Sequence, residues 1–103
     1  MLIVTSHEIP GKTFEAIGLV QGNVVKTKHI GRDIAAGFKS LAGGEIKGYT
    51  ELMVEARVTA TERMIAHAQH LGADAIISAR FITCSVMGGA SEVMAYGTAV
   101  KYK

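Results

Sequence analysis

The chain has 103 residues, enough for one domain, and 49% of them are hydrophobic. Eleven Lys and Arg against nine Asp and Glu give a formal net charge of +2, which argues against a nucleic-acid-binding protein. The amino terminus does not have the pattern of a signal peptide, and no apolar run approaches the roughly 20 residues that span a bilayer. The single cysteine excludes an intrachain disulfide, which fits the reducing cytoplasm. Together, these features predict one cytoplasmic domain, residues 1–103, without a membrane partner.

Two strands are predicted before the first helix. Leu2 to Thr5 is short and apolar, and a Pro-Gly turn follows it. Thr13 to Thr27 is rich in Val and Ile but contains Gly18 and Gly22, which indicates one curved strand or two short ones. The densest basic run, between residues 26 and 32, has no aromatic neighbours for base stacking and is predicted to be a solvated strand end.

Two helices are predicted, a short one and a long one. Arg32 to Leu41 repeats apolar residues three and four apart and ends at a pair of glycines. Thr50 to Leu71 contains neither Gly nor Pro and would form a helix of roughly 30 Å, with Thr50 as N-cap and Gly72 at its end. Its apolar side chains share one broad face, which indicates an amphipathic helix that covers a sheet. This face consists of Met53, Val54, Val58, Ala60, Met64, Ile65, Ala68 and Leu71.

One charged residue, Arg57, lies in the middle of this apolar face, about one turn from Met53 and Ala60. A guanidinium group in that position needs a partner, because burying an unpaired charge is costly. Two interpretations remain open. Arg57 either lays its aliphatic stem on the core and reaches a carboxylate or carbonyl, or it binds an anion.

Two more strands are predicted after the long helix, Asp74 to Cys84 and Glu92 to Tyr102. A hairpin loop that contains Gly88 and Gly89 joins them. Strict alternation divides the side chains of the first of these strands between the two sheet faces. The two sets are Ala75, Ile77, Ala79, Phe81 and Thr83 on one face, and Ile76, Ser78, Arg80, Ile82 and Cys84 on the other.

The sheet face that does not meet the helices is predicted to be too apolar for open water. It carries Ile76, Ile82, Met94, Tyr96 and Val100. With no Trp, three Phe and three Tyr, the chain has few of the large side chains that usually dominate the core of a monomer. We therefore expect a homo-oligomer in which another copy of the chain covers this face.

Candidate metal ligands are few. His67 and His70 are three residues apart near the end of the long helix, so both could approach one ion. Surface histidines that favour the negative end of the helix are the alternative. Cys84 is either a third, weaker candidate ligand or a small buried hydrophobic residue, since no Cys-x-x-Cys or His-Glu-x-x-His motif accompanies it.

The motifs of an enzyme are missing from the sequence. Neither glycine pair has the spacing of a phosphate-binding loop, and none of the serines stands in a nucleophile-elbow context. We therefore expect a protein that is not an enzyme.

The strongest polar pattern is a set of two arginines and two glutamates, each in or beside an apolar stretch. These residues are Glu45, Arg57, Arg80 and Glu92. They could form an ion-pair network within or between subunits, or they could surround a small polar ligand.

Residues spread over nearly the whole chain match the pattern of one protein family. They are Gly18, Val20, Gly22, Val25, Gly43-Gly44-Glu45, Tyr49-Thr50, Ala56-Arg57, Ala60, Arg63-Met64, Ala68, Leu71-Gly72-Ala73-Asp74-Ala75, Arg80, Glu92 and Ala95-Tyr96-Gly97-Thr98-Ala99-Val100. On these residues the chain resembles the YbjQ-like family of small bacterial and archaeal proteins, with Asp74 where that family commonly has Asn. The resemblance implies a dodecin-like α+β subunit that assembles into a ring, with a homopentamer as the expected form, and it brings a label of heavy-metal binding.

The predicted fold is α+β, a two-layer subunit in which a curved, mainly antiparallel sheet packs on one long and one short helix. The predicted function is that of a homo-oligomer that binds a small ligand or metal ion at subunit boundaries. A structural scaffold without a small ligand is the alternative. The residues do not identify the ligand, metal or cofactor.

Overall fold

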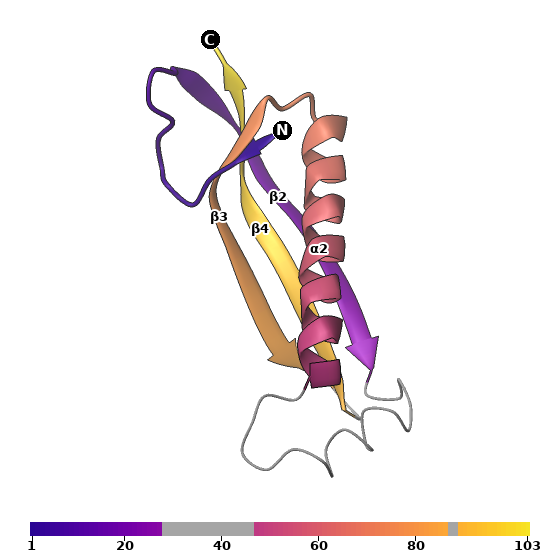
Figure 1. Ribbon diagram of the computed structural model, residues 1–103. Coiled ribbons are helices and arrows are strands. Elements are labelled where there is room, and N and C mark those ends of the chain that lie inside the picture. Colours follow the sequence, from indigo (N-terminus) through magenta and orange to yellow (C-terminus); the bar gives the residue numbers. More distant parts are fainter. Residues whose placement is uncertain (28–46, 87–88) are drawn as a thin grey trace.

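The computed structural model describes residues 1–27, 47–86 and 89–103, and Figure 1 shows a long helix lying against one face of a sheet. The elements in chain order are β1 (Leu2–Ile3), β2 (Phe14–Thr27), α2 (Lys47–His70), β3 (Ala75–Ser85) and β4 (Ala90–Tyr102). The predicted α+β class is confirmed. The predicted short helix, the first glycine pair and Glu45 lie outside the described residues.

The sheet is mixed and has the strand order β1-β3-β4-β2. The central strand β4 pairs antiparallel with both β2 and β3, while the short β1 runs parallel to β3. The expectation of a mainly antiparallel sheet is therefore confirmed. β2 is one continuous strand, with a shift of register between Ala16 and Gly18.

Small residues let α2 lie close to the sheet. The buried side of the helix repeats every four residues, and it packs on buried residues of β2 and β4 such as Val20 and Val93. Its members are Leu52, Ala56, Ala60, Met64 and Ala68. A Cβ atom built on Gly22 would lie 2.3 Å from the carbonyl oxygen of Ala60, so only glycine permits this approach of two backbones.

The predicted apolar face of the long helix is partly wrong. Val54, Val58 and Leu71 are exposed, whereas the alanines form the contact with the sheet. The reason is that close packing of backbones, rather than the area of large side chains, determines which side of this helix is buried. The predicted N-cap is also wrong, since α2 begins at Lys47.

The predicted end of the helix is confirmed. Gly72 has a φ of +76°, its amide donates to the carbonyl of Gln69, and the amide of Ala73 donates to the carbonyl of Ala68. These two bonds form a Schellman motif, which satisfies carbonyl groups at the end of the helix.

A bulge in β3 makes the predicted alternation of that strand wrong. Ser78 has a φ of +53°, and the register with β4 shifts between Ile77 and Arg80. Before the bulge, Ile76 faces α2 and is fully buried; after it, Phe81 lies on the helix side, opposite Ala95. The bulge therefore moves Ile76 from the predicted apolar outer face into the core.

We call the side of the sheet away from α2 the outer face. At one end, the segment around Ile9 covers it, together with Phe14 and Tyr102, so that Val100 is buried within the chain. The other end is uncovered, and its outward side chains are Leu19, Gln21, Asn23 and Val25 from β2, Ile82 and Cys84 from β3, and Glu92, Met94 and Tyr96 from β4. Leu19 is 65% exposed, Val25 51% and Ile82 48%.

Within the described ranges, no helix combines the length and the apolar character needed to cross a membrane.

Candidate functional site

Two predicted residues meet on the uncovered part of the outer face. The register of β3 and β4 places Cys84 directly opposite Glu92, and Cys84 Sγ lies 3.8 Å from Glu92 Oε1. Asn23, which lies diagonally across on β2, donates from Nδ2 to Glu92 Oε2 at 3.2 Å. The Cys84 thiol therefore lies on one side of the Glu92 carboxylate, and the Asn23 amide holds the other side.

The Cys84–Glu92 pair has the chemistry of half a metal site. The thiol of Cys84 is exposed, and a cysteine thiolate and a carboxylate are both common metal ligands. The thioether of Met94 belongs to the same face, two residues from Glu92 along β4. Two strong donors do not complete a site, however, because metal sites in proteins usually take three or four protein ligands.

Arg80 does not join Glu92 within one chain. Its Nη1 donates to the carbonyls of Thr5 and Ala79, each at 2.9 Å, and so ties the segment after β1 to β3. Arg80 pairs with Tyr96, four positions from Glu92, which is about 13 Å at 3.3 Å per residue.

Arg57 lies on the opposite side of the sheet from Glu92. It is exposed on α2 and lines a hollow together with Val58, Thr61, Glu62 and Phe81. The four predicted polar residues are therefore not gathered in the described part of one chain, because the sheet separates Arg57 from Glu92 and Glu45 lies outside that part. The prediction that Arg57 lies in the middle of a buried apolar face is wrong, because Arg57 is exposed.

The hollow beside Arg57 is part of a groove between α2 and β3. The helix lies over β2 and β4 and touches β3 only slightly, as Figure 1 shows. Two adjoining hollows of about 290 and 280 Å³ share Thr61 and Phe81. We call this the α2–β3 groove; it is lined by Arg57, Val58, Thr61, Glu62, Met64, Ala79, Phe81 and Ala95, with Ile3 to Thr5 and Arg80 at one end.

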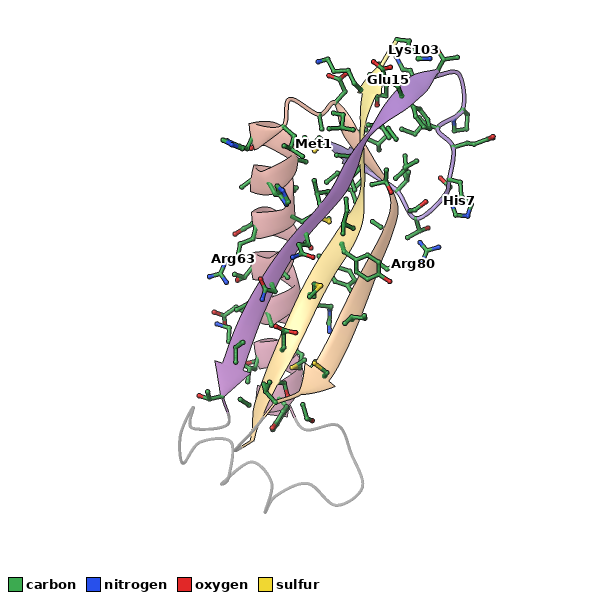
Figure 2. The ribbon with its side chains drawn as sticks, turned by 180° about the vertical axis from the view of Figure 1, so that it is seen from behind. Met1, His7, Glu15, Arg63, Arg80 and Lys103 are labelled. Atoms are coloured by element: carbon green, nitrogen blue, oxygen red, sulfur yellow. The ribbon has the colours of Figure 1, made fainter. Side chains whose placement is uncertain are left out.

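The predicted histidine ligands lie elsewhere. His67 Nδ1 accepts a bond from the amide of Gln21 at 3.2 Å, and Arg63 Nη1 donates to the carbonyl of Asn23 at 2.6 Å. These two side chains of α2 thus satisfy groups on the free edge of β2. Figure 2 shows Arg63 and Arg80 at opposite edges of the sheet.

His67 and His70 are in the last turn of α2, on the helix side, whereas Cys84 is on the outer face near the end of β3. The structure does not bring the three candidate metal ligands together. Among residues 1–27, 47–86 and 89–103, no three His, Cys, Asp or Glu side chains lie close enough to hold one metal ion.

Sequence reasoning treated Cys84 and Glu92 as separate candidates and missed both their pairing and Asn23. A signal was available in the hairpin. Ser85 pairs with Ser91 beside the loop. The next pair along the two strands, one residue farther from the loop, is therefore Cys84 with Glu92.

Comparisons with known proteins agree over the whole chain. The YbjQ family model, described as "Putative heavy-metal-binding", matches residues 1–103. A UPF0145 protein from Thermotoga maritima is 58% identical over 102 residues, which cover 98% of this chain and 96% of that protein. A UPF0145 protein from Photobacterium profundum is 59% identical over 102 residues, with coverage of 98% and 99%.

A solved structure shares the fold. The crystal structure of a protein of unknown function from Pediococcus pentosaceus, of the DUF74 family, superposes with a TM-score of 0.70 and 20% identity. The match covers 100% of this chain and 98% of the other. At that identity, the similarity establishes the arrangement of helix and strands.

Proposed function

The chain belongs to the YbjQ family of UPF0145 proteins, and from that premise we propose that it is a homo-oligomer that binds a soft metal ion at a subunit boundary. The expected assembly is a ring of dodecin-like subunits, most simply a homopentamer. We propose a non-enzymatic role in the reducing cytoplasm, where the exposed thiol of Cys84 stays free to act as a ligand.

The observation that carries this proposal is the contact between Cys84 Sγ and Glu92 Oε1 at 3.8 Å. Thiolate ligands favour soft and borderline metals such as Zn²⁺, Cd²⁺ and Cu⁺ over Mg²⁺ and Ca²⁺. Asn23 fixes the far oxygen of the carboxylate, as groups around metal ligands commonly do. The pair therefore fits the family description better than any other group of described residues.

The surroundings of the pair support a site shared between subunits. Val25 and Ile82 flank it and are about half exposed, although such apolar side chains on a sheet are usually covered. A neighbouring subunit that covers this face would remove water from the Cys84–Glu92 pair and could supply the missing ligands.

An assembly protein without a small ligand is the second candidate. It is favoured by the absence of any three-ligand group in the described parts of one chain. In that case Glu92 and Arg80 contribute only to the structure of the subunit or of the ring.

Titration with Cd²⁺ tests the proposal, because cadmium–thiolate bonds absorb in the ultraviolet. The wild-type protein should bind Cd²⁺ with this absorption. Cys84→Ser should abolish it, and Glu92→Gln should weaken binding by about tenfold or more. Ser85→Ala is the matched control, since residue 85 is the next in β3 and points to the other face.

Equal Cd²⁺ binding by the wild-type protein and Cys84→Ser would contradict the site. A wild-type protein that binds no Cd²⁺ while remaining a homo-oligomer would favour the assembly protein instead.

A further inference from the structure

Two uncovered apolar surfaces lie on opposite sides of this subunit. One is the uncovered part of the outer face. The other is the α2–β3 groove, where Phe81 is 53% and Val58 52% exposed. Because the two surfaces differ in shape and face in different directions, they are not two halves of one patch.

The two surfaces also carry charged groups of opposite sign: Arg57 lies in the groove, together with Glu62, and Glu92 lies on the outer face. In the described parts of the chain the ion pairs are Lys26–Glu55 and Lys101–Asp74, so the exposed guanidinium of Arg57 in the groove has no carboxylate partner. On the outer face, the described residues that donate to Glu92 are Asn23 and Cys84, and neither is a cation. An unpaired arginine on one surface and an uncompensated carboxylate on the other are complementary.

We propose that the outer face of one subunit docks into the α2–β3 groove of a second copy, so that Arg57 of the partner subunit binds the Glu92 carboxylate. The apolar side chains then cover each other: Leu19, Val25 and Ile82 from one copy, Val58 and Phe81 from the other. This inference rests on the proposed homo-oligomer and names the two surfaces that form its boundary.

A second copy is the occupant that accounts for both surfaces together. A small molecule in the groove would leave the apolar side chains of the outer face in water, and it would give Arg57 no link to Glu92. A two-fold contact would join like surfaces and so place Arg57 near Arg57 or Glu92 near Glu92. When unlike surfaces meet, a row of subunits has a free groove at one end and a free outer face at the other. If these two ends also meet, the row closes into a ring.

The contact also fits the proposed metal site. Cys84 lies beside Oε1 of Glu92, whereas Asn23 holds Oε2. Arg57 of the partner subunit would approach from outside the sheet and bind the carboxylate alongside Asn23, leaving Oε1 for the metal. In this arrangement Arg57 is a positioning residue for Glu92 rather than a ligand.

Charge reversal tests the pairing, with the mass of the assembly in solution as the readout and a chelator present. Arg57→Glu and Glu92→Arg should each shift the protein to smaller species, because like charges would then face each other in a buried contact. The double variant should regain the wild-type mass. Ala66→Glu is the control, since residue 66 is exposed on α2 and lies outside the groove, and its mass should not change.

The outcomes separate this inference from the metal proposal. A monomeric wild-type protein, single variants that keep the full mass, or a double variant that stays dissociated would each overturn the pairing. Because the chelator removes metal, none of these results depends on Cd²⁺ binding. Conversely, loss of Cd²⁺ binding in Cys84→Ser with an unchanged mass would leave the pairing intact.

Thiol crosslinking provides a second measurement. Val58→Cys adds a thiol to the groove, and the native Cys84 lies on the outer face, so a short bismaleimide should link subunits into a ladder beyond the dimer. Cys84→Ser in the same background should remove the ladder. Dimers alone, or no crosslinked species, would contradict the contact between unlike surfaces.

Discussion

Replacing Gly22 by alanine is the sharpest test of the close packing of α2 on the sheet. A Cβ atom there would lie 2.3 Å from both the carbonyl oxygen of Ala60 and the amide nitrogen of Met64, and 2.7 Å from the carbonyl carbon of Arg63. All three atoms belong to the helix backbone. No side-chain rotation can therefore relieve the overlap, and Gly22→Ala must move the helix or the strand.

The size of the effect follows from these distances. An ordinary contact begins at 3.4 Å, so the helix must move by about 1 Å, which loosens the buried contacts of Ala56, Ala60 and Ala68. Overpacked core substitutions typically cost about 1–3 kcal/mol, and a rigid backbone places this one at the upper end, about 3 kcal/mol. For a chain of this size, that corresponds to a fall in Tm of about 12–24 °C.

Gly97→Ala is the matched control. Its Cβ atom would lie 2.7 Å from Cγ2 of the Ile76 side chain, which can rotate, and 3.1 Å from the carbonyl oxygen of Ile77. We expect a smaller loss, about 1–2 kcal/mol. Urea unfolding followed by circular dichroism, at equal protein concentrations, measures both variants. A loss below about 1 kcal/mol for Gly22→Ala, or a larger loss for Gly97→Ala, would refute the reasoning.

Substitutions at three further positions test other contacts of the fold. Arg63→Met removes the 2.6 Å bond to the carbonyl of Asn23 and should lower the free energy of unfolding in urea by about 1 kcal/mol. Amide hydrogen exchange along β2 should become faster, and unchanged exchange would show that Arg63 does not protect this edge of the sheet. Asp74→Ala removes the acceptor of the 2.8 Å bond from the amide of Tyr102 and should cost about 1–2 kcal/mol, whereas Asp74→Asn keeps an acceptor oxygen and should lose less than half of that. Ser78→Val should lower the free energy of unfolding by about 2 kcal/mol, because a β-branched residue is strained at a φ of +53°, while Ser78→Gly should stay within about 1 kcal/mol of the wild type. Equal losses for the two variants of either pair would contradict the assigned role.

The secondary structure was predictable because its signals are local. The run without Gly or Pro and the following Gly72 predicted α2 and its end. The richness in Val and Ile predicted β2, and the alternating side chains on either side of a glycine-containing hairpin predicted β3 and β4. The buried side of α2 was not predictable in the same way. The hydrophobic pattern predicts that Val54 and Val58 are buried, although both are exposed. The packing of Ala60 against Gly22 depends on the distance between the helix and the strand, which the pattern does not contain.

The sheet faces were predictable only as far as the bulge. A serine at positive φ has no signal comparable to that of a glycine, so the shift at Ser78 reverses the expected pattern of β3 without warning. The pairing of Cys84 with Glu92 follows from the register beside the hairpin, which strand assignment alone does not give. Arg57 and Glu92 were grouped because each stands in or beside an apolar stretch of the sequence. The sheet separates them in one chain, so that grouping stays a prediction about subunits.

Native mass spectrometry of the untagged protein, with and without added Cd²⁺, tests the central claim most directly, because one spectrum reports both subunit number and bound metal. We expect a closed homo-oligomer, most often a pentamer, that retains Cd²⁺ in the wild type and loses it in Cys84→Ser. A monomer, or an oligomer whose mass is the same with and without Cd²⁺, would contradict this expectation.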